Sequence, residues 1–109
     1  MASTIESSGA IETILFGAST FKVGETVKLV FRAQDELDPP FTVKIFSPAG
    51  KVLVERVLRE LPDGKPQSAP PVQFTIIATG EYKLDISQLY GNKAHGRALI
   101  RVPEAPAPG

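Results

Sequence analysis

The stretch Gly80-Glu81-Tyr82-Lys83-Leu84-Asp85-Ile86 decides the fold class that this chain is expected to adopt. Its apolar residues, Tyr82, Leu84 and Ile86, alternate with charged ones. A period of two puts successive side chains on opposite faces of a β-strand, so one face is expected in a core and the other in solvent. The stretch therefore predicts a half-buried strand and not a helix.

Other segments of similar length show the same kind of pattern. Residues 26–32 place Val27, Leu29 and Phe31 on one face of a strand. Further strand-like segments cover residues 11–16, 41–46, 72–77 and 97–102. Clusters of proline and glycine, such as Ser47-Pro48-Ala49-Gly50, separate these segments and are typical of turns. Short strands between regular turn signals predict an all-β domain.

Residues 51–61 fit two secondary structures. Val54, Val57 and Leu58, with Leu61, would form an apolar stripe on a helix, whereas Val52-Leu53-Val54 reads as a strand. We favour a strand, because the turn signal at residues 47–50 is typical of a tight hairpin.

Two regions carry a resemblance to a known family. Residues 24–33 look like the second strand of immunoglobulin domains, with Phe31 at the position of the first disulfide cysteine. Residues 74–84 look like the fifth strand, the tyrosine corner and the sixth strand, with Leu84 at the second cysteine position. The chain resembles the immunoglobulin-like superfamily between residues 17 and 102, and bacterial immunoglobulin-like, macroglobulin-like and fibronectin-type modules all remain open. It departs from the pattern in having apolar residues at both cysteine positions, no tryptophan, and Thr79 where an acid often stands.

The resemblance implies an all-β, immunoglobulin-like two-sheet antiparallel sandwich of about seven strands. We expect a flexible N-terminal tail over residues 1–10, the sandwich over residues 11–102, and a proline- and alanine-rich linker over residues 103–109. Phe31 and Leu84 are expected to meet between the sheets, filling the space that a disulfide would occupy. The Tyr82 hydroxyl is expected to bond back to the main chain near the corner.

Composition excludes several kinds of function. Twelve basic and twelve acidic residues give a net charge of zero, and the basic residues are interleaved with acids, so no nucleic-acid binding is expected. No apolar run is long enough for direct membrane insertion. Cysteine is absent, which removes disulfides, zinc–thiolate sites and thiol nucleophiles. The acidic run Asp35-Glu36-Leu37-Asp38 offers oxygen ligands, but too few converge from one short segment, so calcium binding is not expected.

No catalytic motif stands out in the sequence. His95 is the only histidine, and no acid or nucleophile is placed around it by sequence spacing. No pair of glutamates is marked by spacing for glycoside hydrolysis. We therefore expect neither an enzyme nor a cofactor.

The expected function is a non-enzymatic structural or adhesive module of a larger surface, appendage or virion protein, located outside the cell or at its surface. It would bind another protein or a copy of itself. The alternative is an accessory domain of a multidomain enzyme, a spacer or a carbohydrate-binding module. The candidate partner surface consists of apolar residues that break the outward polar pattern of their strands: Leu53, Val57, Leu61, Val30 and Phe46.

Overall fold

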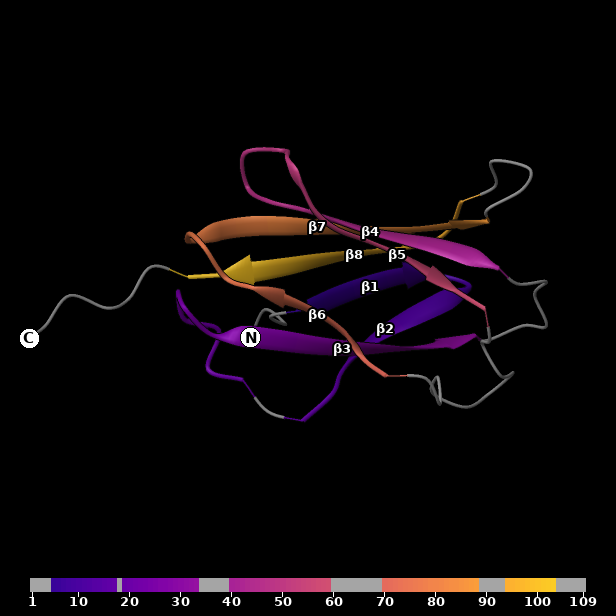
Figure 1. The fold of residues 1–109 in the computed structure, drawn as a ribbon, viewed down its shortest axis with the longest axis horizontal. Helices are drawn as coiled ribbons and strands as arrows, with labels where there is room; N and C mark the ends of the chain where they lie inside the picture. Colours follow the sequence, from indigo (N-terminus) through magenta and orange to yellow (C-terminus); the bar gives the residue numbers. More distant parts are fainter. Residues whose placement is uncertain (1–4, 18, 34–39, 60–69, 89–93, 104–109) are drawn as a thin grey trace, which may run out of the picture.

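The computed structural model describes residues 5–17, 19–33, 40–59, 70–88 and 94–103, which form an all-β fold without a helix (Figure 1). The strands are β1 (Ile5–Gly9), β2 (Ile11–Leu15), β3 (Thr26–Ala33), β4 (Phe41–Phe46), β5 (Val52–Leu58), β6 (Val72–Thr75), β7 (Gly80–Gln88) and β8 (Ala94–Val102). The predicted all-β class is confirmed. Within the described residues, no helix could cross a membrane.

The strands form two antiparallel sheets that pack as a sandwich. The first has the order β1-β8-β7-β4-β5, and the second has the order β2-β3-β6. Figure 1 shows the two layers, with β7 and β8 running along one of them and β3 along the other. Contacts of β2 with β1 and β8 bring the two layers together on one side. On the opposite side β5 and β6 are the edge strands.

One strand lies within residues 1–10, where the sequence predicted a tail. The described residues hold eight strands, in line with the predicted number of about seven, and Ile5–Gly9 pairs antiparallel with β8. Ile5 lies opposite Ile100 and packs against the core, while the other four residues of β1 are exposed. One apolar anchor is too little to generate an alternating pattern, so sequence reasoning missed this strand.

The strand interpretation of residues 51–61 is confirmed over Val52–Leu58, while residues 60 and 61 lie outside the described part of the chain. Val52–Leu58 forms β5 and pairs with β4 over its whole length. The pairing is interrupted once, where Ile45 lies opposite Val54 and Phe46 lies opposite Val52. Leu53 is therefore an extra residue on β5, a β-bulge. Because of the bulge, the residues that precede Leu53 lie on the opposite face of the sheet from the one that strict alternation predicts.

The core lies between the two sheets, where the alternating pattern placed it. Phe31 on β3 and Leu84 on β7 are both fully buried and belong to one hydrophobic cluster. The other residues predicted to share this core are also buried: Leu29, Val43, Ile45, Phe74, Ile76 and Tyr82. Hydrocarbon from both layers thus occupies the space between the sheets.

Tyr82 forms the corner that the sequence predicted. Its side chain is fully buried, and its ring lies 5.2 Å from the ring of Phe74, between centroids. The hydroxyl donates a hydrogen bond to the Ala78 carbonyl at 2.7 Å and accepts one from the Ala78 N–H at 3.0 Å and one from the Ile77 N–H at 3.1 Å. Three bonds from one hydroxyl fix the connection between β6 and β7.

Gly80 allows a second element to pack against this corner. Its φ angle is +126°, in the region that favours glycine, and a Cβ added there would lie 3.0 Å from the Cβ of Pro48. The turn between β4 and β5 therefore sits directly against the start of β7. A larger residue at position 80 would meet both backbone strain and a steric clash.

Truncation of Phe31 tests the inter-sheet core. Phe31→Ala removes a fully buried ring, and we expect it to lower the free energy of unfolding by about 3 to 5 kcal/mol, measured by urea denaturation. Val52→Ala, at a side chain that is 50% exposed, is the control and should change the unfolding free energy by less than about 0.5 kcal/mol. A loss below about 1 kcal/mol for Phe31→Ala would contradict the proposed core.

Removal of the Tyr82 hydroxyl tests the corner. Tyr82→Phe keeps the ring in place but leaves two main-chain donors and one acceptor without their partner, so we expect a loss of about 1 to 3 kcal/mol in unfolding free energy. Amide hydrogen exchange at Ile77 and Ala78 should become faster in the variant, while exchange at Leu29 in the centre of β3 changes only with global stability. Unchanged exchange at the two corner amides would show that the hydroxyl does not hold the connection.

Candidate interaction surface

The outer face of the five-stranded sheet carries a row of alternating charges. Arg97 lies opposite Asp85, Asp85 opposite Lys44, and Lys44 opposite Glu55, so the row crosses four strands. The Nε atom of Arg97 is 3.7 Å from Oδ1 of Asp85, and both side chains are about half exposed or more. Exposed pairs of this kind contribute little to stability, so the row is a solvated surface.

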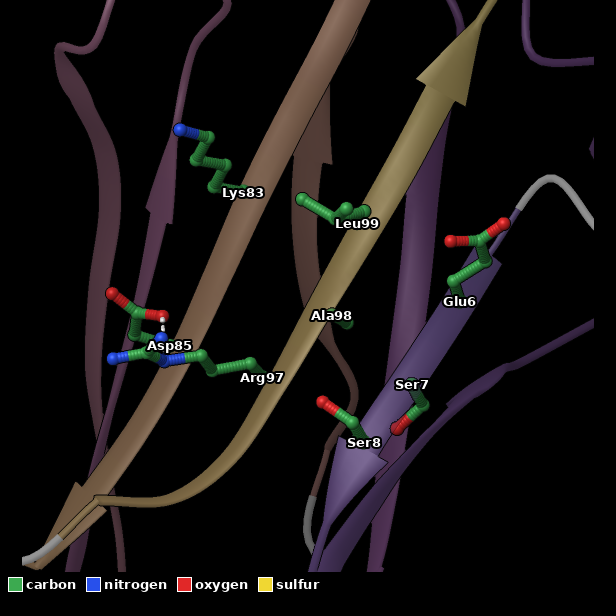
Figure 2. Close-up of a pocket in the computed structure, with 8 residues that line it drawn as sticks. All are labelled: Glu6, Ser7, Ser8, Lys83, Asp85, Arg97, Ala98 and Leu99. Atoms are coloured by element: carbon green, nitrogen blue, oxygen red, sulfur yellow. Dashed lines mark ion pairs between the residues drawn. The ribbon is translucent and has the colours of Figure 1, made fainter.

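An open hollow of about 640 Å³ lies over β1, β7 and β8 on this face (Figure 2). The residues that line it are Glu6, Ser7, Ser8, Lys83, Asp85, Arg97, Ala98 and Leu99. Its four charged side chains carry two charges of each sign, and Figure 2 shows Arg97 reaching toward Asp85 across the strands. Among the hollow's described side chains no base is hydrogen-bonded to either serine, so the arrangement lacks an activated nucleophile. Within the described part of the chain, no group of three His, Asp or Glu side chains could hold a metal ion.

Exposed apolar side chains also lie on this face along β4 and β5, on either side of the Lys44–Glu55 pair. Phe46 lies opposite Val52, and Thr42 lies opposite Val57. Val52 is 50% exposed and Val57 is 43% exposed, while Phe46 is half-buried. β5 is an edge strand, and no strand in the described residues pairs with its free side. We call Phe46, Val52 and Val57, together with the free edge of β5, the β5 surface.

The structure separates the five residues that the sequence analysis grouped together. Val57 and Phe46 lie on the β5 surface, whereas Val30 is in the three-stranded sheet and only 6% exposed. Leu53 is half-buried and packs against the core. Leu61 lies outside the described residues.

Sequence reasoning missed Val52, which it placed inward. The bulge at Leu53 is the cause, because one extra residue reverses the faces of the positions before it. Val52 therefore points outward beside Phe46, and Leu53 points toward the core. No signal in a single sequence marks this bulge, since all three residues at positions 52–54 are apolar.

Two other groups considered in the sequence analysis add nothing to the site. The acidic run at residues 35–38 lies outside the described residues. His95 falls within β8.

Glu25 has the one clearly shifted pKa among the described titratable groups. The Thr20 hydroxyl donates to its carboxylate and is the largest cause of the lowered pKa, with smaller support from the main-chain N–H groups of Lys22 and Thr20. Glu25 is partly exposed and lies just before β3, away from the hollow and from the β5 surface. Its role is to hold the connection between β2 and β3, where Phe21 packs against the core at a φ of +52°.

Comparison with known proteins gives no match. No protein-family model matches the chain, and neither a curated protein nor a solved structure resembles it at a significant level.

Titration of Glu25 tests the role of this carboxylate. Because its pKa is lowered in the folded state, the stability it adds is present above the pKa of an unfolded glutamate and is lost as the pH falls through the lowered folded value. NMR titration should give a midpoint below the ordinary value of 4.5, and Thr20→Val should raise that midpoint. The stability difference between wild type and Glu25→Gln should shrink as the pH falls through this range. An unshifted midpoint in the wild type would contradict the assignment.

Proposed function

We propose that this chain is a non-enzymatic structural or adhesive module that binds another protein, or a copy of itself, through the β5 surface. The single observation that carries the proposal is the free edge of β5, flanked by two exposed valines on the outer face of the sheet. An edge strand presents unpaired N–H and C=O groups, which can add a further strand. A location outside the cell or at its surface belongs to the same proposal.

We also propose that the sandwich is immunoglobulin-like. The order β8-β7-β4-β5 supports this, because it corresponds to the order of the last, sixth, third and following strands in the variable-type sheet. The pairing of β2, β3 and β6 and the tyrosine corner support it further. The antiparallel pairing of β1 with β8 is a separate feature of this chain and does not contribute to the correspondence with the variable-type sheet.

The remaining edges are less suited to strand addition. β6 has only four residues, and β1 and β2 contact each other across the two layers more extensively than β5 and β6 do. β5 has seven residues and faces solvent with a mixture of valine and charged side chains. A strand that adds to β5 would gain main-chain hydrogen bonds and cover Val52 and Val57 on one side.

Lysine substitutions on the β5 surface test this function without removing core residues. Val52→Lys with Val57→Lys should leave unfolding free energy within about 1 kcal/mol of wild type, because both side chains are largely exposed. Random peptides displayed on phage are selected on immobilised wild type and then measured against the variant. We expect the selected peptides to lose binding to the variant, because the lysines charge the surface that the added strand would cover.

The matched control carries the same charge change elsewhere. Val23 is 55% exposed and Ile77 is 58% exposed, and Gly24 is hydrogen-bonded to Ile76, so both lie near one end of the three-stranded sheet. Val23→Lys with Ile77→Lys should retain binding. The β5 surface would be excluded if the selected peptides bind both double variants equally and wild type and β5 variant also sediment identically at all concentrations.

A further inference from the structure

We propose that β5 pairs with β5 of a second copy of this chain, antiparallel and about a two-fold axis that passes beside Val57. This inference rests on the proposed function and names its partner. Two sheets would join edge to edge, and the five-stranded sheet of each copy would continue into the other.

Geometry limits the ways in which two identical β5 edges can meet. Neighbouring antiparallel copies are related by a two-fold axis perpendicular to the sheet, so the outer faces of both sheets lie on the same side. A residue on the outer face then lies opposite an outer-face residue of the other copy. The possible registers differ only in which residue lies at the axis, and therefore faces its own copy.

Charge excludes two of these registers, and the Val57 register is favoured because it pairs opposite charges. With the axis at Glu55, two carboxylates would face each other, and with the axis at Arg56, two guanidinium groups would do so. Like charges directly opposite each other are destabilising. With the axis at Val57, one valine faces the other, and Glu55 faces Arg59 of the second copy twice over by symmetry.

The burial of these side chains fits the Val57 register. Val57, Glu55 and Arg59 are all exposed in the single chain, so each is available for a cross-strand contact. Arg56 lies in an inward register opposite Val43 and is exposed because β5 is at the edge. In this register it faces the buried Leu58 of the second copy and not another arginine, so its aliphatic stem has an apolar neighbour.

The bulge limits how far the pairing extends. Leu53 disturbs the ladder at the start of β5, and bulges twist an edge away from a new partner. The regular part of β5 runs from Val54 to Leu58, so a ladder centred on Val57 is short and ends at Arg59, the residue that follows the strand. A small interface of this kind gives a weak dimer, and the two-fold axis closes it, so no filament grows.

Charge reversal tests both the partner and the register. Sedimentation velocity of wild type, up to millimolar concentration, should show a monomer–dimer equilibrium. Glu55→Arg or Arg59→Glu alone should weaken dimerisation about tenfold, because two attractive pairs become repulsive. The double variant Glu55→Arg, Arg59→Glu should dimerise like wild type. An equimolar mixture of the two single variants should form a heterodimer, since every cross-strand pair is again of opposite sign.

Control variants show whether a loss of dimerisation comes from the register or from a change in net charge or folding. Glu81→Arg and Arg97→Glu make the same charge changes on β7 and β8 of the same face, and they should leave dimerisation unchanged. Protection of the Ile77 and Ala78 amides from exchange reports that each variant keeps its tyrosine corner.

Three outcomes would overturn the inference: a wild type that stays monomeric at millimolar concentration, a dimer insensitive to both single variants, or single variants that weaken the dimer without recovery in their mixture. None of these decides the proposed function, which depends on whether peptide binding is lost in the Val52→Lys, Val57→Lys variant and kept in its control.

Discussion

The apolar contact between the two sheets is the constraint on which the rest of this structure depends. The chain has no cysteine, so no disulfide joins the layers and their packing rests on non-covalent contacts. Phe31 and Leu84 are fully buried within one cluster, and burying such side chains contributes about 1.5 to 3 kcal/mol each. Because a shift of one residue would turn a strand's apolar set toward solvent, this core also fixes the strand register.

Sequence reasoning succeeded where a strand crosses the middle of a sheet. β3 and β7 have neighbours on both sides, and their alternating patterns placed Phe31, Tyr82 and Leu84 correctly in the core. The hydrogen bonds of Tyr82 were predictable as well, because a buried hydroxyl at such a corner needs main-chain partners. In these strands one face is buried and the other meets solvent, so apolar and polar residues alternate along the sequence.

Edge strands were predicted less well, for a physical reason. β1 buries only part of Ile5, and its strand conformation comes from pairing with β8, a contact distant in the sequence. The bulge in β5 lies within a run of three apolar residues, so the pattern cannot indicate which of them points inward. Thr13 is a second residue whose position the pattern does not indicate. It is polar but occupies an inward position of β2, where its hydroxyl is buried without a hydrogen-bond partner among the described residues. Sequence reasoning therefore placed Val57 on the outer face of β5, where the structure has it, but missed that Val52 shares this face.

The same edge effects explain why a surface and not a cavity is the candidate site. A sandwich uses its interior to hold its sheets together, and the described interior is filled by side chains from both layers. The hollow over β1, β7 and β8 is lined by charges that balance one another, so it offers no net field to attract a charged ligand. Among the described residues, β5 has a neighbouring strand on one side only, so main-chain groups on its other side have no partner strand and lie beside exposed valines. If β5 is the interface that we propose, selective recognition depends on the order of side chains along this strand, because Glu55, Arg56 and Val57 are the residues that a neighbouring strand would meet.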